Sequence, residues 1–163
     1  MAFIQGDMAT MHLPMIESYR ETYREHHHST PPPPLMIDLT YCHRDADEAR
    51  RVATECITNY YLCCVEHYEF GDRHFESTTG YESYAAATAA IAEYGLDAIV
   101  DVYVNAQIWG TPEDILAKHR ARKELVGEYE PIMVFQYGGL KGAQALDSYK
   151  LFTAEVLPAL QEM

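Results

Sequence analysis

The sequence is poor in basic residues. It contains 12 lysines and arginines against 25 aspartates and glutamates, which gives a formal net charge of −13. A negative field of this size repels nucleic acid and anionic membrane surfaces, so neither is an expected partner. The sequence also has no segment near the roughly 18 to 20 consecutive apolar residues that a membrane-spanning helix requires, which argues against a membrane partner as well.

Cysteines are few, and their spacing matches no metal or redox motif, so no metal site is predicted. The four are Cys42, Cys56, Cys63 and Cys64. The first residues lack the basic segment and apolar run of a secretion signal, and the expected location is therefore the reducing cytoplasm. The sequence also lacks a phosphate-binding loop, a dinucleotide glycine fingerprint and a Ser–His–Asp order, which excludes the most easily recognised enzyme classes.

The length corresponds to one ordinary domain. The chain has 163 residues, whereas an eight-fold (β/α) barrel typically needs about 250 residues and at least about 200. The chain is therefore either a smaller open α/β domain or part of a barrel.

The apolar pattern predicts alternating helices and strands. Strands are expected over residues 35–41 and 132–137, and a short one at residues 2–5; helices are expected over residues 14–27, 47–68, 84–94, 111–125 and 143–161. Such alternation is typical of parallel strands joined by crossover helices, the α/β class. A parallel sheet this small leaves edges and one face uncovered, so self-association is expected.

Three parts of this pattern are more specific. Thr111 starts a helix well, because threonine caps it, Pro112 takes its first position and Asp114 lies three residues after the cap. Residues 96–109 are ambiguous, since the alternating valines there favour a strand while a helix remains open for the first half. The last helix is expected to bury Leu146, Tyr149, Phe152, Val156 and Leu160.

Candidate site residues lie near the ends of the predicted strands. The Gly138-Gly139 pair after the last strand permits a close backbone approach to a ligand, but it also suits a plain turn between strand and helix. His43 follows the first long strand on the side where barrel enzymes carry their chemistry, although a polar helix boundary explains it equally well. Trp109 can line a pocket or belong to the core. The polar, aromatic segment 67–84 is either a substrate loop or an ordinary surface loop.

Several segments carry a family resemblance. The sequences LMIDLTYCHRDADEARRVA, VEHYEFGDRHFESTTGYESYA, QIWGTPEDILAKHRARKELVGEYEPIMVFQYGGL and LFTAEVLPALQ resemble the C-terminal half of the bacterial luciferase-like flavin-dependent monooxygenases. The resemblance implies a partial (β/α)8 TIM barrel, comprising its last two or three βα units with an inserted helical segment. Residues 1–163 would then form a single luciferase-like domain, the C-terminal portion, with no counterpart of the first barrel strands.

The same resemblance implies a chemistry. Members of this family use reduced FMN, or a deazaflavin in some branches, and react with O₂ to oxidise an organic substrate, often with a separate flavin reductase. The flavin-side contacts implied here are Gln136, Tyr137, Gly138 and Gly139, and the implied substrate-pocket residues are His43, His74, Tyr81 and Trp109.

Two hypotheses follow. The first is a flavin-dependent monooxygenase portion that is active only when joined to its missing half. The alternative is a non-catalytic truncated paralogue, or an interaction module that docks on a full-length luciferase-like subunit through exposed sheet edges. A stand-alone binding domain of unrelated function remains a third interpretation.

Overall fold

A computed structural model of the chain describes residues 2–4, 6–69, 75, 79–80 and 82–163. Its strands are β1 (Ala2–Phe3), β2 (Leu35–Cys42), β3 (Ile108–Gly110) and β4 (Glu130–Val134). The helices are the π-helix η1 (Met8–His12), α1 (Leu13–His27), α2 (Ala46–Tyr68), α3 (Glu82–Tyr94), α4 (Leu96–Ala106), α5 (Pro112–Val126), α6 (Gly142–Glu155) and α7 (Leu157–Gln161).

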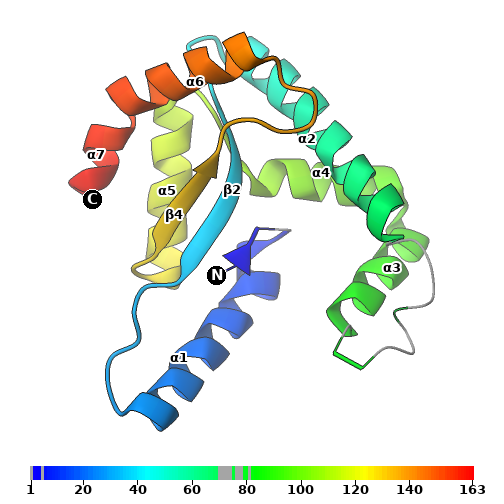
Figure 1. Cartoon of the computed structure of the whole chain (residues 1–163), viewed down its shortest axis with the longest axis vertical. Coiled ribbons are helices and arrows are strands. Elements are labelled where there is room, and N and C mark those ends of the chain that lie inside the picture. Colours follow the sequence, from blue (N-terminus) through cyan, green and yellow to red (C-terminus); the bar gives the residue numbers. More distant parts are fainter. Residues whose placement is uncertain (1, 5, 70–74, 76–78, 81) are drawn as a thin grey trace.

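β2 is the central strand of the sheet, and every strand that pairs with it runs parallel to it (Figure 1). β4 pairs along residues 35–39 of β2, β1 along residues 36–37 and β3 along residues 40–42. β1 and β3 lie end to end on the same edge of β2. Ile37 forms its backbone hydrogen bond on the side of β1, and His43 forms its own with β3. Residues an even number apart along a strand direct their backbone groups to the same edge, so both neighbours lie on that edge. The predicted α/β class with parallel strands is confirmed.

Two buried side chains complete the hydrogen bonding of β2 where its neighbours stop. Between β1 and β3, the side-chain oxygen of Gln107 accepts from the N–H of Leu39 (2.9 Å), and its Nε2 donates to the carbonyl of Ile4 (2.7 Å). On the opposite edge, beyond the end of β4, the N–H of Cys42 donates to the hydroxyl of Ser148 at 2.7 Å. The interrupted ladder is thus closed by side chains, as buried backbone groups require.

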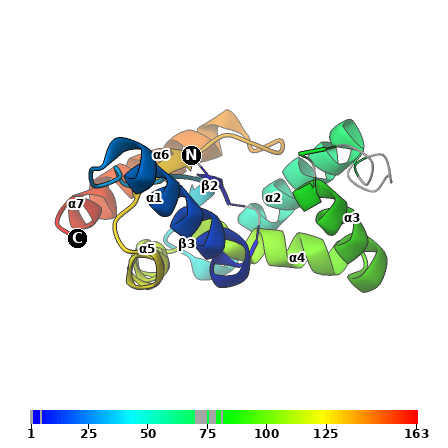
Figure 2. The same ribbon diagram turned by 90° about the horizontal axis from the view of Figure 1, so that it is seen from below.

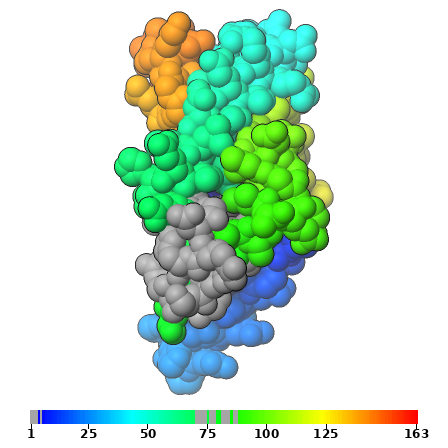
Figure 3. Space-filling view, turned by 90° about the vertical axis from the view of Figure 1, so that its right-hand side faces the viewer, coloured from blue at the N-terminus to red at the C-terminus, as the bar shows by residue number. Residues whose placement is uncertain are grey.

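Helices cover both faces of the sheet (Figure 2). Leu39 and Tyr41 of β2 pack against α2 and α4, which contribute Ile57 and Tyr103 to that cluster. On the other face, Cys42 packs with residues of α5 and α6. α2, α3 and α4 make up much of the surface in Figure 3. Among the described residues, β1, β3 and β4 pair only with β2, so the strands form an open sheet. Closure into a barrel remains a proposal.

The ambiguous segment before Trp109 is a helix, α4, followed by the short strand β3. Val100, Tyr103 and Val104 are buried, whereas Val102 is 49% exposed. This burial has the three- and four-residue spacing of a helix, so the valine alternation, which favoured a strand, was misleading. The three valines repeat at every second residue, but only Val100 and Val104 face the core.

The last third differs from the prediction in its boundaries. β4 covers Glu130–Val134 and starts two residues earlier than expected, because its pairing with β2 begins at Leu35. The predicted closing helix is two helices, α6 and α7, because Pro158 has no N–H to continue the hydrogen bonding of α6. Phe152 and Val156 are buried as expected. Leu146 and Tyr149 were expected to be buried, but they are about half exposed, at 51% and 49%, because they lie on the outer face of α6.

Candidate functional site

α6 lies across the C-terminal end of β2, where the sequence placed the candidate site (Figure 1). Ser148 of α6 binds the backbone of β2 there, and Arg44, just after β2, forms an ion pair with Glu155 of the same helix. The N-terminus of α2 starts at the same end, where Asp45 accepts from the N–H of Glu48 at 2.9 Å. His43, one of the predicted site residues, thus lies directly before the capped start of α2.

The glycine turn after β4 has two different structural roles. Gly138 has φ +51°, and a Cβ added to it would overlap the carbonyl oxygen of Cys56 in α2. Glycine is therefore needed at this position for the turn to pack on the helix. Gly139 has φ +82°, but a Cβ there would meet no atom within 4 Å. Gly139 is exposed, so open space lies in front of it and not in front of Gly138.

Tyr137 carries an unpaired hydroxyl inside the core. Its side chain is 7% exposed and packs in the cluster of Leu39, Tyr41 and α2. Among the described residues, its Oη has no hydrogen-bond partner. Burial raises the pKa of Tyr137, so the phenol stays neutral and able to donate at physiological pH. Gln136, just before it, is exposed. A role of these residues in flavin contact stays a prediction.

His43 is half-buried at the C-terminal end of β2. Its Nδ1 accepts from the N–H of Asp45 at 3.1 Å, and its ring lies nearly parallel to that of Tyr41, with the centroids 6.2 Å apart. Tyr41 in turn shares a core cluster with Tyr137 and Trp109. The structure therefore gathers three of the predicted residues, His43, Trp109 and Tyr137, around Tyr41.

Trp109 is a core residue in this structure. It is 8% exposed, and its indole N–H donates to the carbonyl of Val104 at 2.7 Å. Lys118 lies over its ring with the ammonium 4.4 Å from the ring centroid. Of the two interpretations left open for Trp109, the packing favours the core one. His74 and Tyr81 lie outside the described residues, and their predicted role is not tested.

Sequence reasoning missed a buried ion pair next to the edge formed by β1 and β3. Arg122 of α5 donates two hydrogen bonds to Asp38 of β2, at 2.6 and 2.8 Å, and their side chains are 6% and 0% exposed. Arg122 also lies over the ring of Tyr129, whose hydroxyl is 2.6 Å from Nδ1 of the buried His119. The one sequence signal was a charged residue, Asp38, inside a mostly apolar strand.

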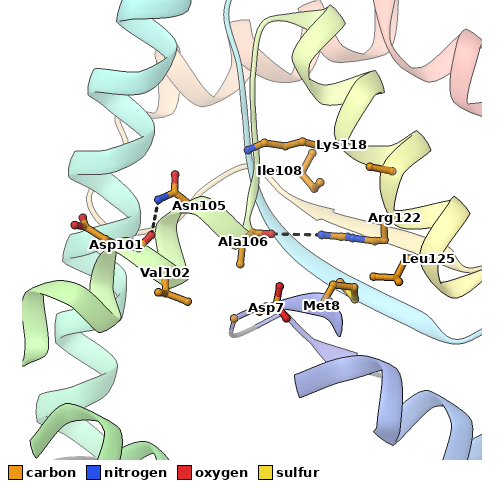
Figure 4. A pocket seen from close by; sticks show the side chains of 12 residues that line it. Asp7, Met8, Asp101, Val102, Asn105, Ala106, Ile108, Lys118, Arg122 and Leu125 are labelled. Carbon is orange, nitrogen blue, oxygen red and sulfur yellow. Dashed lines mark hydrogen bonds between the residues drawn. The ribbon is translucent and has the colours of Figure 1, made fainter. Parts of the chain in front are cut away.

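A cavity of about 590 Å³ adjoins this ion pair, bounded by η1, α4, β3 and α5 (Figure 4). Lys118 and Arg122 line it from α5, one turn apart. None of the predicted site residues that the structure describes lines it. No helix in the described part of the chain is both long enough and apolar enough to cross a membrane.

No protein-family model matches the sequence. No curated protein matches it either. Solved structures do match. The oxygenating constituent of 3,6-diketocamphane monooxygenase from Pseudomonas putida, a type II Baeyer-Villiger monooxygenase in complex with FMN, is similar over 96% of this chain and 41% of its own, with a TM-score of 0.61 at 20% identity. Monooxygenase RslO1 from Streptomyces bottropensis is similar over 93% of this chain and 40% of its own, with a TM-score of 0.53 at 15% identity.

The chain has the fold of part of these monooxygenases. At 15–20% identity the likeness concerns the fold alone. The chain spans about two fifths of the length of both solved structures.

Proposed function

We propose that residues 1–163 form the C-terminal portion of a luciferase-like flavin-dependent monooxygenase. The chain would take part in the oxidation of a small organic substrate by O₂ only together with the polypeptide that supplies the rest of the fold. The observation that carries this proposal is the match of 96% of the chain to 41% of an FMN-bound monooxygenase. The family resemblance of the sequence supports it independently. Such a protein would act in the cytoplasm.

The turn after β4 has features that suit a flavin. Tyr137 has a buried hydroxyl without a partner among the described residues, and a bound polar ligand would satisfy it. Gly139 has open space in front of it, and Gln136 is exposed beside it. These residues would hold one side of the cofactor, with Tyr137 donating a hydrogen bond. Reduced FMN, or a deazaflavin instead, would supply the electrons for the reaction with O₂ when bound, and a flavin reductase would be its source.

The test is a titration of the purified chain with FMN, alone and mixed with the missing N-terminal portion of a luciferase-like monooxygenase. Flavin fluorescence reports binding. We expect Tyr137→Phe to weaken FMN binding roughly 2- to 12-fold, the value of one hydrogen bond of about 0.5–1.5 kcal/mol. Without flavin the same variant should unfold at an equal or higher urea concentration, since it removes a buried unpaired hydroxyl.

The matched control is Tyr149→Phe, which changes an exposed hydroxyl on α6. It should leave both FMN binding and stability unchanged. The proposal fails for this polypeptide if FMN binds neither the chain alone nor the mixture. It loses its assignment of Tyr137 if Tyr137→Phe binds FMN as tightly as the original chain.

A second candidate is a non-catalytic module that docks on a luciferase-like subunit. The exposure of Leu146 and Tyr149 on α6 favours it, because apolar side chains on one outer helix face suit a protein interface. Its test is the mass of the chain in solution by light scattering. Self-association of the chain that is lost in Leu146→Ser would support this module. A chain that stays monomeric at all concentrations would refute the idea that it self-associates through this face of α6.

A further inference from the structure

The cavity beside α5 has the composition of a small-molecule site. Its volume of about 590 Å³ lies within the range of about 300–1,000 Å³ typical of ligand pockets. Half of its lining residues carry an apolar side chain: Met8, Val102, Ala106, Ile108, Ala121 and Leu125. Val102 and Leu125 are 49% and 43% exposed, so apolar surface is open to solvent on two sides of the cavity. A ligand with a hydrocarbon part would cover them.

The two cations of the cavity differ in how their charge is balanced. The guanidinium of Arg122 is neutralised by its two hydrogen bonds to Asp38. Lys118 has no ion pair within the part of the chain that the structure describes. Its Nζ donates to the backbone carbonyl of Gln107 at 2.9 Å and lies 4.4 Å from the centroid of the Trp109 ring. The carboxylates of Asp114 and Asp38 act on the Lys118 ammonium from a distance and raise its pKa, but neither forms an ion pair with it among the described residues. A carbonyl and a ring face attract an ammonium without cancelling its charge, so the Lys118 charge is only partly balanced and an anion can complete the balance.

The acidic side chains of the cavity limit how much negative charge a ligand can carry. Asp7 and Asp101 are exposed. The Asp7 carboxylate accepts from the N–H and hydroxyl of Thr10, at 2.8 and 2.9 Å, and the backbone hydrogen bond lowers the pKa of Asp7. These two carboxylates repel any anion, and they repel a dianion about twice as strongly as a monoanion. The arrangement therefore suits a single negative charge placed at Lys118.

We propose that this cavity binds an apolar monocarboxylate, with its carboxylate on the Lys118 ammonium and its hydrocarbon against Val102, Ile108 and Leu125 (Figure 4). In Figure 4 Lys118 lies above Ile108, and Leu125 and Val102 lie on opposite sides of the lining. Residues 136–139 do not line the cavity, so the site is separate from the proposed flavin contacts.

The test compares octanoate with its neutral counterpart octanamide, by calorimetry and by the fluorescence of Trp109, the only tryptophan of the chain. We expect octanoate to bind the whole chain more tightly than octanamide. Lys118→Met keeps an unbranched side chain that is shorter only by the terminal nitrogen, and it removes the charge. It should weaken octanoate binding at least about tenfold, the lower limit for a hydrogen bond to a charged group, and change octanamide binding less than about twofold.

The matched control is Lys150→Met, which removes an exposed lysine of α6 outside the cavity and should change nothing. Val102→Trp fills the mouth of the cavity from a half-exposed position and should abolish binding of both probes. Burial, with the nearby guanidiniums of Arg122 and Arg50, lowers the pKa of Lys118 to about 8, although the carboxylates of Asp114 and Asp38 act in the opposite direction. Octanoate affinity should therefore fall as the pH rises above 8, since the amine loses its proton there, while octanamide affinity stays constant.

Equal affinity for the two probes would overturn the proposal, as would full octanoate binding by Lys118→Met or by Val102→Trp. Competition between octanoate and FMN would overturn the separation of the two sites. Loss of FMN binding alone would refute the proposed function and leave this site standing.

Discussion

Replacing Gln107 with leucine should destabilise the protein strongly, although no sequence motif marks this residue. Gln107 is fully buried, and its side-chain amide takes the place of a strand residue between β1 and β3. Leucine has a similar size but neither donor nor acceptor. The variant leaves the N–H of Leu39 and the carbonyl of Ile4 without their partners.

The size of the effect follows from these two groups. A buried polar group left unpaired costs about 1–3 kcal/mol, so the two together should cost about 2–6 kcal/mol. That is a large part of the roughly 5–15 kcal/mol by which a typical domain is stable. Gln107→Glu is a sharper perturbation, because its carboxylate accepts from Leu39 but repels the carbonyl oxygen of Ile4. Protonation of the introduced carboxylate supplies an O–H that donates to that carbonyl instead.

The assay is urea unfolding, followed by Trp109 fluorescence and by far-UV circular dichroism. The carboxyl introduced by Gln107→Glu should have a raised pKa in the folded state, so the stability deficit of this variant should shrink as the pH falls and grow as the pH rises. Gln161→Leu, an exposed glutamine of α7, is the control and should cost less than about 0.5 kcal/mol. A loss below about 1 kcal/mol for Gln107→Leu, or a deficit of Gln107→Glu that does not change with pH, would refute the reasoning.

Three further predictions concern other parts of the fold. Gly138→Ala should lower the free energy of unfolding in urea by about 2–5 kcal/mol, because the added Cβ combines backbone strain at φ +51° with overlap on α2. Gly139→Ala should lower it by only about 1–2 kcal/mol, from strain alone. Equal losses for the two variants would contradict the packing role of Gly138. Burial lowers the pKa of His119 to about 4 from its usual 6.5. Protonation of the unfolded chain should therefore remove about 2 kcal/mol more stability between pH 7 and 5 from the original protein than from His119→Leu, and equal losses in the two proteins would contradict this. Thr111→Ala should lower the stability by about 1 kcal/mol, since it removes the capping box of α5, and an unchanged urea midpoint would show that the cap contributes nothing.

The sequence predicted the elements of the fold better than the candidate site. The capping box at Thr111 and the parallel strands were predicted from local residues and are present. His43 and Tyr137 were chosen by their positions near strand ends, and Trp109 as a possible pocket residue. His43 stacks on Tyr41, and Trp109 and Tyr137 share a core cluster with it, but their roles in a site stay predictions. The cavity at Lys118 was missed, because it joins η1, α4 and α5, which are distant in sequence.

By itself the sequence indicated the start of several helices and the class of fold they build, but it did not determine helix α4 or the break between α6 and α7. Caps, prolines and apolar spacing act over a few residues, so they can be read without knowledge of the rest. Only the tertiary structure decided that Gln107 bridges two strands, that Asp38 meets Arg122, and that Leu146 stays exposed. Each of these features depends on contacts between segments that are distant in sequence. Whether a side chain is buried depends on which element packs against it, and the spacing of apolar residues along its own helix does not decide this.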